Sequence, residues 1–593
     1  MQKLLDILSE ITGKAFIKAG YDGELGRVSV SNRPDLCEFQ CNGAMAGAKK
    51  YGKAPIQIAE EVAEILKEDK SFGKVEAVKP GFLNLDISES FLSEYAEKLS
   101  GDEKLGTEDI GKGRTIIVDY GGANVAKPLH IGHLRSAVIG ESVKRILSFC
   151  GYRTIGDVHL GDVGLQMGLI ITELKERQPK LPYFDESFTG DYPKDAPFTL
   201  SDLEEIYPKA STRSKEDEAY REAAQKATLK LQEGHRGYHA LWEHILRLSK
   251  EDLKKNYDNL DVHFELWKGE SDAIPYVKDM VDSLVEKGIA YESEGALVVD
   301  IAEESDPKEY PPCIVRKSDG AANYETSDLG TLVEREKLYS PDGYVYLADK
   351  RQELHYTQFF RVAKRGGIVK PDSELKFIGF GTMNGKDGKP FKTRAGGVLR
   401  LEYLIKEINE AAYEKIKESN KEKGREVSEE EARETARIVG LAALKYGDLS
   451  NQAVKDYVFD MDRFMAFEGN TGPYILYTIV RINSILEKYG VSDEVIKGYS
   501  FNAKLNESEK ALMLKLSQVN QILEGACEEL APHKICSFIY DVANEFNRFY
   551  HGTKILSEEN EERKQGYIAL ISFANRVLKQ CITLLGFAAP QKM

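Results

Sequence analysis

The sequence predicts an α/β protein in which a Rossmann-like domain with a helical insertion follows a small α/β domain and precedes an all-α C-terminal bundle. Three observations predict this order. The apolar run at 115–120 breaks at two glycines and re-enters as a helical pattern, which is how a βαβ unit begins. Strand-like alternation precedes it, and helical periodicity fills the chain after about residue 405.

Length and composition exclude several classes of protein. The 593 residues allow about three to five domains, and 42% hydrophobic with 30% charged residues is an ordinary globular composition. Disordered, collagen-like and coiled-coil chains are therefore excluded. The net charge of −16 argues against a general DNA-coating protein, but it permits a nucleic acid bound on local basic patches.

Cysteine usage and hydropathy predict a cytoplasmic protein. The seven cysteines are irregularly spaced without a C-x-x-C motif, so neither a disulfide framework nor a zinc ribbon is indicated, and we expect reduced thiols. No run of about 18 apolar residues is present, so we expect no membrane partner. The first twenty residues read as an amphipathic helix and not as a signal peptide.

Residues 1–110 are expected to form the small α/β domain. A helical pattern is followed by a strand, a second helix and two alternating runs that Pro80-Gly81 separates. These expected elements span residues 4–11, 27–30, 56–66, 75–78 and 82–87. The charged, glycine-containing stretch 101–113 is then the linker.

Residues 111–405 are expected to form the Rossmann-like domain, with a charged, helix-rich insertion over about 175–310. The strand at 115–120 leads into a helix whose first turn should contain Pro128, because proline suits that position. Strand-like runs at 344–348 and 376–380 continue the sheet. Apolar stripes at helical spacing over 406–593 predict the C-terminal bundle.

A group of chemically useful residues follows the first strand of this sheet, namely Asn124, Lys127, His130, Gly132 and His133. Two histidines three residues apart project from one face of a helix, beside the free N–H groups and positive dipole end that favour a phosphate. The glycine between them lets a flat ligand such as a purine approach the backbone. Two histidines that merely cap a turn are the alternative, but the strand, the glycines, the lysine and the asparagine favour a nucleotide site.

The segment 130–133 reads His-Ile-Gly-His and is similar to the signature of class I aminoacyl-tRNA synthetases, and 123–133 resembles the arginyl-tRNA synthetase version. Further resemblances at 156–166, 467–474 and 584–593 extend along essentially the whole chain. The resemblance implies an N-terminal domain that contacts the tRNA elbow and a C-terminal domain that binds the anticodon. It also implies a monomeric ligase that uses ATP with substrate-bound Mg²⁺ to join L-arginine to the terminal 2′-hydroxyl of tRNA(Arg), and that needs tRNA for activation.

A second group of cations lies in the glycine-flanked segment 385–397, whose composition suits a lid over a polyphosphate, although a solvated hairpin is the alternative. The Walker A spacing is absent. Class I enzymes place a K-M-S-K-S loop here, from which Pro-Phe-Lys-Thr-Arg at 390–394 departs, and the arginyl family implies that Lys127 takes a share of the missing lysine's role. The expected catalytic residues are Lys127, His130, His133 and Lys392. The expected ATP-binding residues are His130, Gly132, His133, Lys389, Lys392 and Arg394.

The segments 323–328 and 352–355 resemble the family's amino-acid pocket. A guanidinium presents five donors in a planar fork and requires carboxylates and a phenol hydroxyl. Tyr324 and Asp328 are four residues apart and would share a helix face, which Asp119 is expected to oppose. The expected arginine-binding residues are Asp119, Asn124, His130, Tyr324, Asp328 and Gln352.

Two regions are expected to contact RNA. In the basic stretch 42–53, Lys49, Lys50 and Lys53 would meet phosphates while Tyr51 stacks on a base. In the C-terminal helices aromatic side chains would support splayed bases. The candidates there are Tyr446, Tyr457, Phe459, Tyr474 and Tyr477.

Two other hypotheses stay open at this stage. A class I ligase for another amino acid would keep the histidine signature but fail with arginine, and a catalytically silent tRNA-binding protein would fail to turn over ATP. His235, His239 and His244 have a spacing that suits a metal on a helix, but no cysteine or carboxylate pattern completes it. We therefore expect structural histidines and no metal held by the protein.

Overall fold

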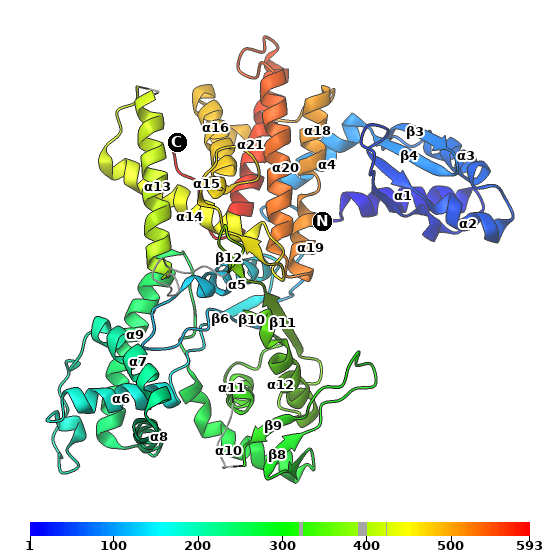
Figure 1. Ribbon diagram of the computed structural model, residues 1–593. Coiled ribbons are helices and arrows are strands. Elements are labelled where there is room, and N and C mark those ends of the chain that lie inside the picture. The colour runs from blue at the N-terminus through cyan, green and yellow to red at the C-terminus, as the bar shows by residue number, and fades with distance from the viewer. Residues whose placement is uncertain (319–323, 390–399, 423) are drawn as a thin grey trace. The chain divides into compact units, whose positions relative to one another are not determined.

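The computed structural model describes residues 1–318, 324–389, 400–422 and 424–593. The chain forms two compact units, one from Gly111–Phe464 and the other from Met1–Ile110 together with Met465–Met593. In the order of the sequence, the labels in Figure 1 run through Met1–Ile110, then through the unit Gly111–Phe464, and finally through Met465–Met593. Within the described ranges no helix combines the length and the apolar character needed to cross a bilayer.

The N-terminal part contains a four-stranded antiparallel sheet with the order β1-β2-β4-β3. Its strands are β1 (Val28–Val30), β2 (Phe39–Cys41), β3 (Phe72–Val78) and β4 (Phe82–Ile87), and its helices are α1 (Leu4–Lys18), α2 (Gly43–Tyr51), α3 (Pro55–Leu66) and α4 (Glu89–Gly101). The two strands predicted on either side of Pro80-Gly81 pair with each other, as expected. Leu8 and Phe16 of α1 and Ile58 and Val62 of α3 are fully buried, so the amphipathic stripes of both helices form the core beside the sheet.

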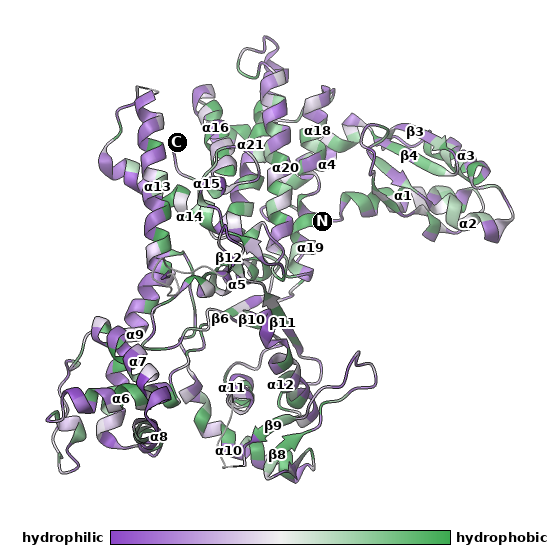
Figure 2. Ribbon diagram, in the orientation of Figure 1, coloured by the Kyte–Doolittle hydropathy of each residue, from purple (hydrophilic) through white to green (hydrophobic). Residues whose placement is uncertain are grey.

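The other part of this unit is a group of helices. They are α16 (Gly472–Tyr489), α17 (Asp493–Ile496), α18 (Glu507–Leu516), α19 (Val519–Glu528), α20 (Pro532–Gly552) and α21 (Glu561–Leu584). Figure 2 shows green and purple residues interspersed along α16, α20 and α21, which is typical of amphipathic helices. The apolar stripes predicted from the sequence are buried, including Ile475, Ile482, Leu512 and Leu578.

The unit Gly111–Phe464 is built on a four-stranded parallel sheet with the order β11-β10-β5-β6. The strands are β5 (Thr115–Asp119), β6 (Arg153–Asp157), β10 (Gly343–Asp349) and β11 (Glu374–Phe380), which confirms the strands expected near 115, 344 and 376. The chain continues from β5 to β6 on one side and reaches β10 on the other, so the strand order reverses between β5 and β10, the position outside whose carboxyl ends open α/β sheets bind ligands. Asp119, Asp157 and Asp349 end three of these strands.

Helix α5 (Ile131–Phe149) follows β5 and packs closely against Tyr120. A Cβ atom on Gly140 would lie 2.3 Å from Cγ of Tyr120, so only glycine allows this approach. The prediction that Pro128 lies in the first helical turn is wrong, because α5 begins at Ile131 and His130 is its N-cap. A side chain that accepts a hydrogen bond from the first turn defines the helix start here, and proline precedes it.

The insertion is mostly helical, as predicted, with α6 (Leu165–Arg177), α7 (Leu200–Glu216), α8 (Glu218–Gln232), α9 (Arg236–Asn259) and α10 (Glu270–Glu286). The expectation of helices is wrong for the end of the insertion. An antiparallel sheet forms there from β7 (Ala290–Ser293), β8 (Ala296–Val299) and β9 (Cys313–Arg316). Leu297 and Val299 of β8 are buried in one core with Leu284 of α10 and Leu332 of α11 (Tyr324–Tyr339). Tertiary packing therefore decides the structure of this short segment.

The same unit continues beyond β11 to Phe464. It contains α12 (Glu353–Gly366), α13 (Leu401–Glu422), α14 (Glu429–Leu449), α15 (Met461–Phe464) and a small pairing of β12 (Met383–Asn384) with β13 (Tyr457–Val458). Helices α13 and α14 thus belong to the compact unit of the parallel sheet, although the sequence groups them with the C-terminal helices.

Candidate active site

The start of α5 brings the two signature histidines together. The ring centroids of His130 and His133 lie 3.9 Å apart. Nδ1 of His133 accepts a hydrogen bond from the backbone N–H of His130 at 3.1 Å, and Nδ1 of His130 accepts one from the N–H of Gly132 at 3.0 Å. The predicted shared face is therefore confirmed, and the backbone holds both rings in place.

These two bonds also fix the tautomer of each ring. Because Nδ1 accepts, the proton of a neutral imidazole lies on Nε2, which becomes an N–H donor. Burial lowers the pKa of His133 to about 3, with the neighbouring His130 adding to the effect. Burial and Lys127 lower the pKa of His130 as well. Both rings are thus neutral donors at the positive end of a 19-residue helix.

The predicted lysines have different surroundings. Nζ of Lys127 lies 4.6 Å from the ring centre of Tyr207 in α7, so the insertion contributes to its position. Lys389 is exposed, in a turn where its carbonyl accepts a bond from the Gly385 N–H at 2.8 Å. Lys392 and Arg394 lie outside the described residues. The described chain resumes at Arg400, which forms an antiparallel β-bridge with His130.

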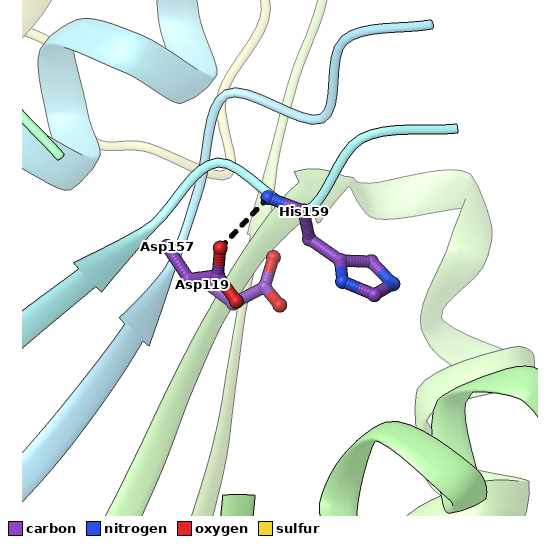
Figure 3. A group of neighbouring side chains, drawn as sticks. All are labelled: Asp119, Asp157 and His159. Carbon is purple, nitrogen blue, oxygen red and sulfur yellow. Dashed lines mark hydrogen bonds between the residues drawn. The ribbon is translucent and has the colours of Figure 1, made fainter. Parts of the chain in front are cut away.

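A buried arginine joins the carboxyl ends of the first two strands. Nη2 of Arg335, on α11, donates to Oδ2 of Asp119 at 2.5 Å and to Oδ2 of Asp157 at 2.7 Å, and its Nη1 donates to the Tyr346 hydroxyl at 3.0 Å. Its side chain is 1% exposed. Asp119 and Asp157 lie side by side with His159 in Figure 3, where the dashed line is the bond from the His159 N–H to Asp157. Asp119 therefore lies at the carboxyl end of β5, where it pairs with a cation of the protein.

Replacing Arg335 with methionine is expected to destabilise the protein by about 3–5 kcal/mol, because two carboxylates would stay buried without their cation. The fall should appear as a lower midpoint of thermal unfolding measured by circular dichroism. Arg351→Met is the control, since that side chain is 81% exposed in its pair with Asp349 and should leave the midpoint unchanged. Equal midpoints for the two variants would contradict the structural role of Arg335.

Asp328 lies at the centre of a second group of side chains. Its Oδ2 accepts a hydrogen bond from Nε2 of His355 at 2.6 Å, and its Oδ1 lies 3.9 Å from Nε2 of His159. Both ring nitrogens of His159 are buried without a hydrogen-bond partner among the described residues. Burial lowers the pKa of His159, but Asp119, Asp157 and Asp328 outweigh it and raise that pKa. The predicted approach of Asp119 and Asp328 thus occurs through His159.

Glu270 is a member of this group that no sequence pattern predicted. It lies in the first turn of α10, and burial raises its pKa to about 7, with Asp328 and Asp162 adding to the rise while His159 opposes it. A cation entering beside Asp328 would hold Glu270 ionised. The sequence signal is weak, since Glu270 follows a glycine at a helix start, as many surface glutamates do. Arg335 and His159 were missed as well, because only the fold brings them to Asp119.

The other predicted pocket residues lie at the edges of this group. Tyr324 is the first residue of α11, 74% exposed and one helical turn before Asp328. Gln352 is exposed directly before α12, three residues before His355. Asn124 forms a parallel β-bridge with Gly161, and a Cβ atom added to Gly161 would lie 2.4 Å from Oδ1 of Asn124. Tyr324 and Asp328 are spaced to share one face of α11, and Gln352 lies just before α12. The arginine-binding role of these residues stays a prediction.

The predicted RNA-binding residues of the N-terminal part have partners within the protein. Lys50 forms an ion pair with Asp22, and Lys53 pairs with Glu61 at 2.7 Å. The Tyr51 ring packs edge-on against Tyr21 with a centroid distance of 4.8 Å. Lys49 is exposed. RNA phosphates would therefore have to compete with carboxylates for two of these three lysines.

The aromatic residues predicted to support RNA bases divide into two groups. Tyr446, Tyr457 and Phe459 are buried core residues, so the expectation that they support bases is wrong for all three. Tyr474 and Tyr477 are partly exposed, and the Tyr474 hydroxyl donates to Asn544 at 2.8 Å and accepts from Asn547 at 2.9 Å. Aromatic residues in a helix bundle are mostly core, and only the fold separates the two groups.

The histidines of the insertion have structural contacts. His235 caps α9 by accepting from the Tyr238 N–H at 3.2 Å, and His244 is buried against the Tyr183 hydroxyl at 3.0 Å. In the part of the chain that the structure describes, the grouping with metal-ligand spacing is Asp119, Asp157 and His159. Arg335 already binds both of these carboxylates, so a dedicated metal cage is a poor fit to this group.

Three family descriptions match the chain. "tRNA synthetases class I (R), catalytic domain" matches residues 95–461, "Arginyl tRNA synthetase N terminal domain" matches 2–87 and "DALR anticodon binding domain" matches 475–593. The chain is 61% identical to an arginine–tRNA ligase of Agathobacter rectalis and 53% identical to one of Alkaliphilus oremlandii, covering 100% of each chain. The arginyl-tRNA synthetase structure of Plasmodium falciparum has a TM-score of 0.80 at 24% identity over 100% of both chains.

Proposed function

The chain belongs to the arginyl-tRNA synthetase family, and from this premise we propose how its own residues perform the reaction of an arginine–tRNA ligase. The enzyme activates L-arginine with ATP and transfers it to tRNA(Arg). In the first step an oxygen of the arginine carboxylate attacks the α-phosphorus of ATP in line, the bond to the bridging oxygen breaks and pyrophosphate leaves. Positioning and charge stabilisation supply the rate, since no covalent bond to the protein is needed.

The α5 N-terminus is proposed as the phosphate site. The Nε2–H groups of His130 and His133 donate to phosphate oxygens on which charge develops, and the helix dipole adds to this stabilisation. Lys127 supplies a cation from the preceding turn. Lys389, Lys392 and Arg394 are proposed to cover the nucleotide, which is supported by the return of the chain to His130 at Arg400. The observation that carries the proposal is the pair of neutral, backbone-fixed imidazoles.

Mg²⁺ is proposed to enter with the nucleotide. The ion prefers oxygen ligands and keeps several waters, so ATP phosphates suit it. The described carboxylates that have metal-ligand spacing are engaged by Arg335, which supports a substrate-bound ion and not a protein-held one.

The pocket around Asp328 is proposed to bind the arginine side chain. Asp328 and Glu270 supply negative charge for the guanidinium, and Tyr324 a hydroxyl, while Asn124, Gln352 and His130 are proposed for the α-amino and carboxylate groups. Citrulline carries no positive charge to pair with these carboxylates, so the site rejects it without a separate editing reaction. Asp119 shapes this pocket through His159 and Arg335.

In the second step a hydroxyl of the terminal adenosine, proposed as the 2′-hydroxyl, attacks the arginyl-adenylate and AMP leaves. Residues 1–110 are proposed as the domain that binds the tRNA elbow and residues 465–593 as the domain that binds the anticodon, with a catalytic domain at 111–464 between them in the sequence. Lys49, Lys50, Tyr51, Lys53 and Tyr474 are proposed contacts. We propose a monomer that works in the cytoplasm and requires tRNA for activation.

Exchange of radioactive pyrophosphate into ATP, measured with arginine, tests this proposal. We expect the rate of exchange with tRNA(Arg) to be at least about tenfold above the rate without tRNA, because the RNA completes the site. Aminoacylation of the same tRNA is measured in parallel. Equal exchange rates with and without tRNA would support the ligase activity but contradict the tRNA requirement.

Lysine and citrulline in place of arginine serve as the specificity controls for the same assay. Neither should support exchange above background, because one presents a single ammonium point charge and the other no charge. Exchange with either at the rate of arginine would contradict the assignment of the pocket.

A further inference from the structure

We propose that His355 is a positioning residue of the amino-acid pocket, which holds the Asp328 carboxylate in place for the substrate guanidinium while Glu325 holds His355 from behind. The inference deepens the proposed function and rests on Asp328 as the carboxylate that binds arginine. It assigns one oxygen of Asp328 to the protein and the other to the substrate.

Both nitrogens of the His355 ring are used. Nε2 donates to Oδ2 of Asp328 at 2.6 Å, and Nδ1 donates to Oε1 of Glu325 at 3.1 Å. Glu325 and Asp328 are three residues apart on α11, so they present their carboxylates on one side of that helix to a single residue of α12. A ring that donates from both nitrogens is an imidazolium, and its bonds to carboxylates are charge-assisted.

Packing restrains the ring in this position. The His355 ring centroid lies 5.2 Å from that of Tyr356 and 5.3 Å from that of Phe359, and Phe359 is fully buried. The side chains of Glu325, Asp328 and His355 are all only about one-fifth exposed. The carboxylate therefore has little room to rotate without breaking its bond to His355.

The bond leaves Oδ1 of Asp328 as the oxygen that accepts no hydrogen bond from the described residues. Nε2 of His159 lies 3.9 Å from it, too far for a hydrogen bond, so His159 does not occupy it. The guanidinium is then expected to contact Asp328 through Oδ1. Glu270 and Tyr324 would bind the remaining donors of the planar fork, which selects arginine over lysine by the number of placed acceptors.

The charges around His355 come from α11, from the loop after β6 and from Lys317, which directly follows β9. Burial lowers the pKa of His355, but the hydrogen bonds to Asp328 and Glu325 outweigh burial and raise that pKa to about 9. Lys317 acts on the Glu325 side, and His159 faces the other oxygen of Asp328. The imidazolium is thus present below about pH 9, and one of its two bonds is lost as the pH rises through this value.

Three variants of the full chain test the inference in aminoacylation with tRNA, namely His355→Leu, His355→Gln and Glu325→Gln. We expect His355→Leu to raise KM for arginine by about tenfold or more, with kcat and KM for ATP changed less than about twofold. His355→Gln should recover much of this loss, because its amide nitrogen can still donate to Asp328. Glu325→Gln should have a smaller effect in the same direction.

The pH profile supplies a readout that a purely structural role would not give. Between pH 8 and about 10 the ratio of KM for arginine in wild type to that in His355→Gln should rise, since only the wild type loses a proton there, and the titrating amino group of arginine is common to both. This comparison remains valid even if the leucine variant fails to fold. A flat ratio, or equal changes in KM for ATP and arginine in the variants, would overturn the inference.

Asp328→Asn distinguishes the inference from the proposed function. If that variant still uses arginine normally, the pocket assignment itself is wrong. If it is impaired while both His355 variants behave as wild type, only the positioning role of His355 is overturned.

Discussion

Asp328→Asn is expected to lower kcat/KM for arginine by about 10²–10³-fold, mainly through KM, because the guanidinium loses a partly desolvated charge partner. The asparagine side-chain oxygen can still accept the hydrogen bond that His355 Nε2 donates to Asp328 at 2.6 Å, so the fold should be preserved. The fall in kcat/KM thus measures the effect of the Asp328 charge separately from any effect of this residue on folding. Steady-state aminoacylation with varied arginine measures it.

Asp372→Asn, in an exposed turn before β11, is the matched control and should behave as wild type. Asp119→Asn is a useful comparison, because it removes a partner of buried Arg335 and should lower the thermal midpoint as well as activity. Arginine use that survives in both the Asp328 and Asp119 variants would mean that the pocket lies elsewhere.

His133→Asn is expected to reduce the rate of arginine activation by about 10²–10³-fold, the usual loss when one placed donor to a developing oxyanion is removed. The asparagine oxygen can still accept from the His130 N–H, as Nδ1 does at 3.1 Å, but no group replaces Nε2–H. His133→Gln is the complementary variant, since its amide nitrogen can reach the Nε2 position, and it should retain more activity. Pyrophosphate exchange in the presence of tRNA measures both.

The pH profile of the same reaction gives an independent check. The pKa of His133 is lowered to about 3, so the ring is neutral at every pH above about 5. Replacing His133 should therefore leave the ionisations seen in the pH profile between pH 6 and 9 unchanged. An asparagine variant as active as the glutamine variant would contradict the donor role of Nε2.

The family and the fold were predictable because their signals are local in the sequence. The His-Ile-Gly-His segment, the apolar run of β5 and the amphipathic helices each depend on neighbouring residues, and the match to the class I arginyl family confirms the resemblance and the fold class. The pairing of His130 with His133 was equally predictable, since residues three apart share a helix face. Helix starts were less predictable, as α5 shows by beginning after Pro128.

The arrangement of charge in the pocket was decided only by the tertiary structure. Arg335 lies 216 residues from Asp119 in the sequence, and Asp328 lies 27 from His355, so no periodicity links them. The parallel sheet brings the carboxyl ends of β5 and β6 together, and α11 then places one cation against two acids. Burial separates the core aromatics from Tyr474 in the same way. Sequence patterns record which face of an element is apolar, whereas pairing between distant elements depends on their packing, which no local pattern encodes.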